Sequence, residues 1–177
     1  MRRSYQVTLV HRMFPLHPNT PSDGMTLEKL FGQQVDVDVM RTQMEALMSA
    51  EGLPYGYRSH TYNTRRAQQL AKWADKQPGG DAIHGALYRA YFVDGINLGD
   101  LDRLLEIATS VGLSGVEARK ALEYETELRH VTNDWKLAKN HQITAVPTYL
   151  SEDRILVGAQ SYEVLEELIL HAGAVLR

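Results

Sequence analysis

The chain has 177 residues, 44% of them hydrophobic, which is enough to bury one core or one core with an insertion. Its net charge of −3 provides no attraction to nucleic acid or to an anionic membrane. It has no cysteine, which excludes a disulfide framework, a thiolate zinc site and thiol catalysis by these residues alone. No apolar run approaches the length of a membrane span, so we expect a cytoplasmic protein that binds neither nucleic acid nor membrane.

The predicted elements begin with a β-strand over Tyr5–His11, in which Tyr5, Val7 and Leu9 share one face. Residues 14–21 contain three prolines and predict a stiff, extended loop. Helices are expected from Thr26, which can act as an N-cap, and from about residue 38, where apolar side chains recur at helical spacing.

The middle of the chain is predicted to be helical throughout. Asn63, Asp81 and Asp100 can each cap a helix that carries an apolar stripe. Ser114 and Glu117 have the Ser-x-x-Glu spacing of a capping box, so another helix is expected there. A longer helix follows and ends near residue 140.

The C-terminal part differs in kind. Thr144–Leu150 and Arg154–Val157 are two β-type runs joined by a short turn, which predicts a hairpin. Ser161 can cap a closing amphipathic helix. The order is therefore a strand, roughly 120 helical residues, a hairpin and a helix, which is typical of one α/β domain that carries a helical insertion.

Several stretches, in this order along the chain, resemble the DsbA-like thioredoxin-fold proteins, most closely their FrnE-type branch. They are Phe14-Pro15-Leu16-His17-Pro18, Glu51-Gly52-Leu53, Asn63-Thr64-Arg65-Arg66-Ala67, the segment 87–100, Val146-Pro147-Thr148-Tyr149 and Gly158-Ala159-Gln160. The resemblance implies an α/β, thioredoxin-like fold of the DsbA type with a large all-helical insertion. Residues 1–25 and 140–177 would form the thioredoxin-like portion and residues 26–139 the insertion, together one structural unit.

Members of this family open with a strand and a helix whose N-terminus carries Cys-x-x-C, where the helix lowers the pKa of a thiol. This sequence resembles the family from the second strand onward, so we expect that N-terminal strand–helix unit to be missing. The Tyr5–His11 strand would then lack its neighbour, and unpaired backbone groups are costly. Three arrangements would fill the gap: Tyr5–His11 moves to the centre, a second copy lends a strand, or the natural product is longer. We favour a homodimer.

The resemblance also implies where a substrate would bind. In the family the proline of the Val-Pro motif is cis and lies beside the redox helix. Pro147 would then be cis, with Val146 offering backbone groups to an extended peptide or a thiol substrate. Ala145, Phe14 and His17 are expected in the same groove. The alternative is that Pro147 belongs to a turn retained by the fold, with no remaining ligand.

Other patterns favour structural roles. The seven histidines are scattered, with none of the spacings that argue for zinc, so we expect neither a metal nor a cofactor. Asn63 with the arginines after it reads as an N-cap before solvated side chains, although an anion at that helix N-terminus is the alternative. Tyr88, Tyr91 and Phe92 are expected in the core with Leu87. Gln142 and Ala145 stand where family members often have glycine, which narrows the permitted backbone angles.

Three functions stay open. The resemblance implies a thiol–disulfide oxidoreductase-like protein of the DsbA/FrnE type, but the catalytic Cys-x-x-C is absent, so this chain would be redox-inactive. It would otherwise act as a binding module at the Val146-Pro147 groove. The alternative is an enzyme similar to 2-hydroxychromene-2-carboxylate isomerases and kappa-class glutathione transferases. That reading ranks below the first, because Gly158-Ala159-Gln160-Ser161 lacks the aspartate with which those proteins hold glutathione.

Overall fold

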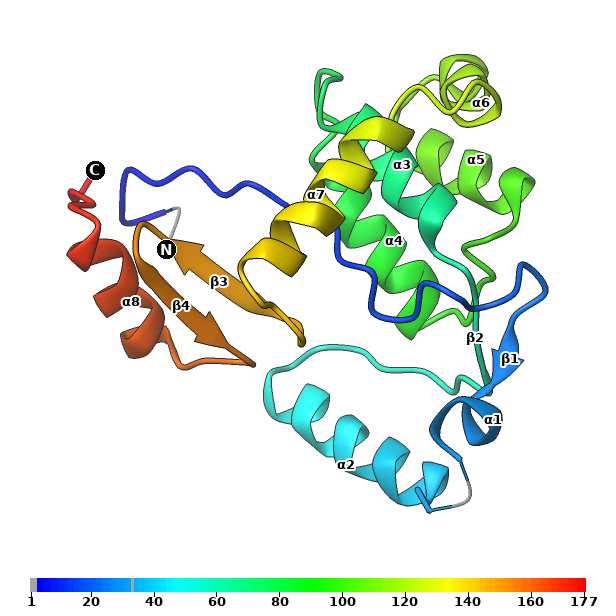
Figure 1. Cartoon of the computed structure of the whole chain (residues 1–177), viewed down its shortest axis with the longest axis horizontal. Helices are drawn as coiled ribbons and strands as arrows, with labels where there is room; N and C mark the ends of the chain where they lie inside the picture. The colour runs from blue at the N-terminus through cyan, green and yellow to red at the C-terminus, as the bar shows by residue number, and fades with distance from the viewer. Residues whose placement is uncertain (1–2, 33) are drawn as a thin grey trace. The chain divides into compact units, whose positions relative to one another are not determined.

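Residues 3–32 and 34–177 are described by the computed structural model, in which the chain divides into two compact units (Figure 1). Met1–Leu16 and Asn133–Arg177 form the terminal unit, and His17–Thr132 forms the helical unit. From the sequence we expect the thioredoxin-like portion and the helical insertion to meet between residues 25 and 26 and between residues 139 and 140. The two units of the structure meet between residues 16 and 17 and between residues 132 and 133. The two expected portions include residues 1, 2 and 33, which lie outside the described residues.

The helical unit contains one short β pairing and most of the helices. β1 (Met25–Thr26) runs antiparallel to β2 (His60–Thr61). The helices of this unit are α1 (Leu27–Phe31), α2 (Val37–Ala50), α3 (Arg65–Ala74), α4 (Ala82–Phe92), α5 (Leu101–Ser110) and α6 (Gly115–Glu123). α7 (Leu128–Asn140) begins in this unit and continues past the unit boundary at Thr132.

Side-chain caps start most of these helices where the sequence predicts. The side chains of Thr26, Asp100 and Ser114 each accept a hydrogen bond from the backbone N–H three residues on, which confirms three predicted starts. α2 begins slightly earlier than predicted, because Asp36 caps it. The carboxamide oxygen of Asn63 accepts a backbone N–H at the start of α3, at 3.0 Å.

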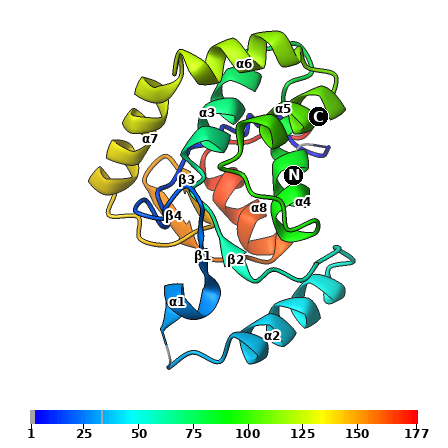
Figure 2. The same ribbon diagram turned by 90° about the vertical axis from the view of Figure 1, so that its right-hand side faces the viewer.

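The core of the helical unit lies among α3, α4, α5 and α6, which pack on one another in both views (Figures 1 and 2). Leu70, Ile83 and Leu104 have no exposed surface, and Val131 from the start of α7 is 1% exposed. In the same two views α2 stands apart from these helices, and none of its residues is buried.

α4 begins directly after Asp81, as predicted, but two details of the prediction are wrong. Asp81 makes no capping hydrogen bond, because its own backbone is already helical (φ −62°, ψ −22°), whereas a capping residue is extended. The backbone N–H of Ile83 bonds instead to the carbonyl of Gly80. Tyr88 is 62% exposed and not part of the core, since it lies one position round the helix from the buried Leu87.

The terminal unit contains the predicted hairpin and closing helix, although the first strand of the hairpin begins at Thr148 and not at Thr144. β3 (Thr148–Ser151) and β4 (Arg154–Val157) pair antiparallel, with Thr148 opposite Val157 and Ser151 opposite Arg154. α8 (Tyr162–His171) begins at Ser161, whose hydroxyl accepts the N–H of Val164 at 3.4 Å. No helix in the described ranges is long and apolar enough to cross a membrane.

The predicted strand over Tyr5–His11 is wrong. Only Tyr5 pairs, in an isolated antiparallel bridge to Leu176 near the C-terminus. A strand requires a partner, and within the described ranges β3 and β4 pair only with each other. Leu9 and Val10 are consequently 54% and 57% exposed in an extended segment without regular structure.

Candidate substrate-binding site

The loop between α7 and β3 holds three of the predicted site residues together. The peptide bond between Val146 and Pro147 is cis, as the resemblance implies. The hydroxyl of Thr148 donates to the carbonyl of Ala145 at 2.7 Å, and the backbone N–H of Gly158 donates to the carbonyl of Pro147 at 2.8 Å. The loop is therefore fastened both to the first residue of β3 and to the residue after β4.

Val146 leaves both of its backbone polar groups unused. Its residue surface is 47% exposed, and neither its N–H nor its C=O bonds to another residue in the described part of the chain. The carbonyl oxygens of Ala145 and Pro147 on either side are already occupied. Val146 thus offers one backbone donor and one acceptor to solvent, which are the groups that an added extended chain would use.

The turn that leads into this loop depends on Gln142. Its φ is +55°, in the left-handed region that favours glycine, and it closes the C-terminus of α7. The backbone N–H of Ile143 donates back to the carbonyl of Ala138 at 2.9 Å. Gln142 and Ala145 both stand where family members often have glycine, but Ala145 is not among the residues with positive φ. Only Gln142 therefore carries a conformational cost, of about 1 kcal/mol.

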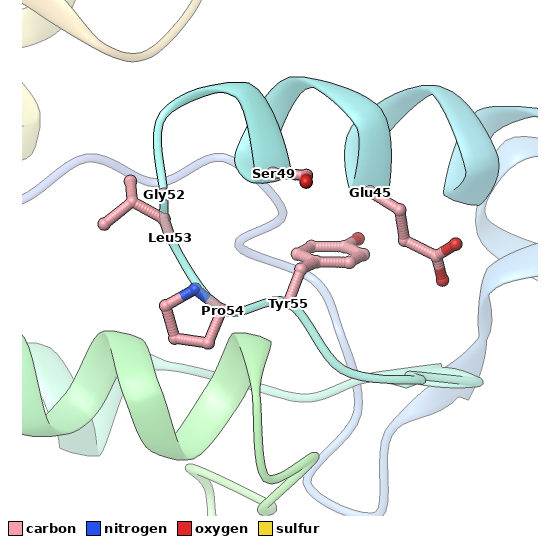
Figure 3. A pocket seen from close by; sticks show the side chains of 6 residues that line it. All are labelled: Glu45, Ser49, Gly52, Leu53, Pro54 and Tyr55. Carbon is pink, nitrogen blue, oxygen red and sulfur yellow. The ribbon is translucent and has the colours of Figure 1, made fainter.

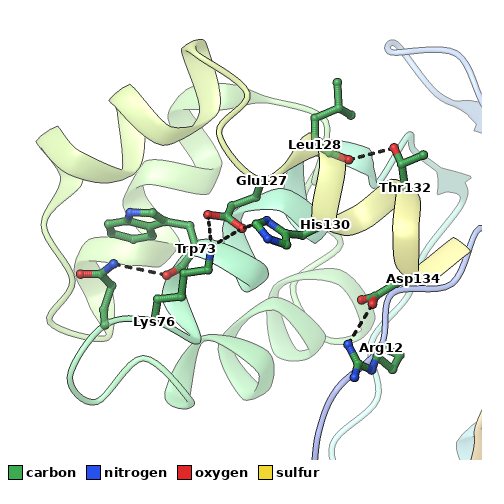
Figure 4. Close-up of polar contacts among 9 residues, drawn as sticks. Arg12, Trp73, Lys76, Glu127, Leu128, His130, Thr132 and Asp134 are labelled. Atoms are coloured by element: carbon green, nitrogen blue, oxygen red, sulfur yellow. Dashed lines mark hydrogen bonds and ion pairs between the residues drawn. The ribbon is translucent and has the colours of Figure 1, made fainter. Parts of the chain in front are cut away.

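Phe14 lies in the same unit and is half-buried. The segment before it is held by Asp134 of α7, which is 4% exposed (Figure 4). The backbone N–H of Met13 donates to Asp134 Oδ2 at 3.0 Å, and Arg12 Nη1 donates to Oδ1 at 3.2 Å. Asp134 therefore fixes the path of the chain into Phe14.

Sequence reasoning missed Asp134. The signal was its position on α7, three residues after Val131 and four before Ala138, which are both buried. An acidic residue on the buried stripe of a helix requires a partner, because burying an unpaired charge is costly. The pattern shows that a partner exists but not which residue it is.

His17 belongs to the helical unit, where its contacts are local. Its ring meets the ring of Phe31 edge-on, with centroids 6.4 Å apart. Its carbonyl accepts both the N–H and the hydroxyl of Thr20, at 3.2 and 2.9 Å. These bonds shape the proline-rich loop, and the part of His17 in a binding site stays a prediction.

A second buried carboxylate serves the helical unit. Glu127 is 5% exposed and accepts Lys76 Nζ at 2.6 and 2.8 Å on its two oxygens (Figure 4). His130 Nδ1 lies 2.8 Å from Oε2 of the same carboxylate. Because Lys76 follows α3 and His130 lies on α7, Glu127 ties the two helices together.

In the terminal unit, Tyr5 is anchored to α8. Its hydroxyl donates to Glu166 Oε1 at 2.7 Å. This hydrogen bond to a carboxylate, together with burial and the negative charge of Glu166, raises the pKa of Tyr5 to about 12. The backbone of Tyr5 also bridges to Leu176, so the two ends of the chain meet here.

Comparison with known proteins decides the family. The family described as the DSBA-like thioredoxin domain matches residues 1–170. This chain belongs to that family. The structure of a probable DsbA oxidoreductase from Streptomyces coelicolor superposes with a TM-score of 0.85 at 26% identity, covering 95% of this chain and 76% of that one.

A curated relative of this DsbA-like chain is the uncharacterized protein YwbO of Bacillus subtilis. The two are 34% identical over 91 residues, which is 51% of this chain and 46% of YwbO, so the match spans about half of that protein. The DsbA-like family and a mostly helical α/β fold are thus confirmed, in a chain of 177 residues without cysteine.

Proposed function

We propose that this DsbA-like chain belongs to the FrnE-type branch and binds extended polypeptide at the Val146–Pro147 loop. One observation carries the proposal: Val146 exposes an unpaired backbone N–H and an unpaired C=O, while the carbonyls on both sides are bonded within the loop. Ala145 and Pro147 hold this geometry, and Phe14, in the same unit, is a further expected member of the site.

An extended peptide laid beside Val146 would accept its N–H and donate to its carbonyl, as in strand addition. Each bond contributes about 0.5–1.5 kcal/mol net, so the backbone pairing alone gives weak binding. The exposed Val146 side chain adds apolar contact. Because backbone groups do most of the recognition, the site would accept many sequences.

Thiol–disulfide exchange begins with attack by a thiolate, and none of the 177 residues is a cysteine. The proposal is therefore binding without exchange by these residues. The purified chain should not accelerate the reduction of insulin by dithiothreitol, and acceleration above the buffer rate would contradict this part of the proposal.

The glutathione-dependent alternative is disfavoured by the residue that stands at the expected aspartate. Gln160 uses its amide nitrogen locally, donating to the carbonyl of Val157 at 2.7 Å. A neutral side chain engaged with its own hairpin has no charge to offer the glutathione amine. Calorimetric titration with glutathione should show no micromolar binding.

The binding test uses a fluorescent, unstructured peptide and measures its anisotropy. N-methylation of the peptide nitrogen that pairs with Val146 should weaken binding by roughly tenfold, because it removes one donor and adds a clash. Val146→Ser should weaken it also, whereas Ile155→Ser, at an exposed position of β4 (41% exposed), should not. Equal affinity for every methylated position would refute pairing at Val146.

The same unit supports a proposal on assembly. Leu9 and Val10 are more than half exposed in an extended segment that pairs with no strand within the described ranges. Unpaired extended backbone beside apolar side chains is a template for pairing with another chain. We therefore propose a homodimer through the terminal unit. Light scattering should give twice the chain mass, and Leu9→Lys should shift it to the monomer; a monomeric wild type would contradict the proposal.

A further inference from the structure

Exposed apolar side chains concentrate around α2 in the helical unit. Helix α2 has no buried residue, and in the described part of the chain it is the only helix of which this is true. The large apolar side chains exposed here are Phe31, Val35, Val39, Met44, Leu47, Leu53 and Tyr57, at 37% to 68%. A helix with no fully buried residue gains little stability from packing, although packing supplies most helix stability in proteins.

The sequence of α2 is nevertheless that of a helix with an apolar face. Met40, Met44, Leu47 and Met48 recur at spacings of three and four, so they share one side of the helix. The carboxylate of Asp36 caps the helix by accepting two backbone N–H groups, at 3.0 and 3.1 Å. Methionine is unbranched and adapts its shape, and such faces are used to bind varied partners.

A groove runs beside this helix (Figure 3). The chain turns back at Gly52, and Leu53, Pro54 and Tyr55 line an open space of about 440 Å³ together with Glu45 and Ser49 of α2. The ring of Tyr55 lies across from Ser49 and Glu45, whereas the side chain of Leu53 points away from them (Figure 3). The ring of Tyr55 also stacks on a phenylalanine of α4, with ring centroids 6.5 Å apart. The wall opposite α2 is thereby attached to α4.

The rim of this surface is acidic. Residues 36–51 contain the carboxylates of Asp36, Asp38, Glu45 and Glu51 and a single cation, Arg41, which gives the segment a charge of −3. The whole chain also has a net charge of −3, so the remaining residues are balanced. Arg41 is already paired, at 3.0 Å with Asp38 and 3.6 Å with Glu45.

The negative charge of residues 36–51 indicates which kind of partner this surface would bind. A second copy would bring two acidic rims together, and anionic lipid or nucleic acid would be repelled for the same reason. We propose that the side of α2 that carries Met40, Met44, Leu47 and Met48 (the methionine stripe) binds a basic amphipathic segment of another polypeptide. The apolar residues of that segment would lie on the methionine stripe, and its lysines or arginines would lie against Glu45, at the edge of the groove, and Glu51. This surface and mode of binding are separate from the backbone pairing proposed at Val146.

The test uses a fluorescent peptide of about 18 residues, in which leucine and lysine alternate at the spacing of an amphipathic helix. Leu47→Ser should weaken its binding by roughly tenfold, because Leu47 would be buried by the peptide. Val116→Ser is the matched control, since Val116 is 66% exposed on α6 and Leu47 is 64% exposed. Circular dichroism should be unchanged, because α2 contributes nothing to the core.

The electrostatic half of the proposal is tested separately. Glu45→Gln combined with Glu51→Gln should reduce affinity several-fold at low salt, and the difference should shrink as salt is raised. Glu167→Gln, at an exposed position of α8, should have no effect. A peptide with glutamate in place of lysine should not bind.

Each contrary result overturns the proposal. Equal affinity of Leu47→Ser and wild type would exclude the methionine stripe, and equal binding of the acidic peptide would exclude the rim. A fall in molecular mass caused by Leu47→Ser would show that a second copy covers the surface instead. Val146→Ser should leave this binding unchanged, so failure here and failure of the Val146 site can be told apart.

Discussion

Replacement of Asp134 by alanine tests how the chain is held ahead of Phe14. The change removes the acceptor of the Met13 N–H, which is 3.0 Å from Asp134 and belongs to a residue only 9% exposed. An orphaned buried N–H costs about 1–3 kcal/mol. The ion pair adds less than about 1 kcal/mol, because the Arg12 side chain is 58% exposed. We expect a total loss of about 2–3 kcal/mol.

Amide hydrogen exchange followed by NMR reports on this bond directly. The Met13 amide should exchange roughly 30- to 150-fold faster in Asp134→Ala, which corresponds to the same free energy. Urea unfolding should rank Asp134→Ala as more destabilising than Asp134→Asn, which keeps one acceptor oxygen, and Arg12→Ala as the mildest. If Arg12→Ala destabilised as much as Asp134→Ala, the exposed ion pair and not the buried N–H would be the main contribution, and the reasoning would fail.

Three further predictions concern stability. The pKa of Tyr5 is raised to about 12, so its hydrogen bond adds stability that is complete below the ordinary tyrosine pKa near 10 and is lost as the pH rises through 12. Urea unfolding should therefore show wild type to be more stable than Tyr5→Phe below pH 10, and this difference should disappear between pH 10 and pH 12. Gln142→Gly should raise the unfolding free energy by about 0.5 kcal/mol, because it relieves a φ of +55°; a loss would show that the side chain contributes more than the backbone costs. Glu152→Gly should do the same in the turn between β3 and β4, where φ is +51°, and Asp153→Gly, without positive φ, should destabilise.

Local signals were sufficient for the helices and the hairpin. Thr26, Asp100 and Ser114 are capping residues in the sequence and in the structure, because the hydrogen bond involved spans only three positions. The hairpin over β3 and β4 is equally local. The segment Tyr5–His11 shows where such reasoning stops, since a β-type composition cannot form a strand unless another strand is beside it.

The sequence motif of the candidate site could be predicted, but the distant residues that hold the surrounding chain in place could not. The Val-Pro motif located the loop, and its cis bond was implied by the resemblance to the DsbA-like family. Asp134 and Glu166 lie more than 100 residues from the groups that they bind, and a single sequence does not indicate such pairs. The burial of Tyr88 was predicted wrongly for a different reason. Neighbouring positions on a helix differ by 100°, and when the apolar stripe is broad the sequence does not show which residues at its edge are buried.

A helix that stands outside the core has a consequence for how this chain can change over time. Most substitutions in a packed helix are removed by selection because they unfold the protein. Mutations on α2 escape that filter, since no residue there is buried. The partner proposed for α2 can therefore change with little risk to the core, and related chains are free to diverge at this helix first.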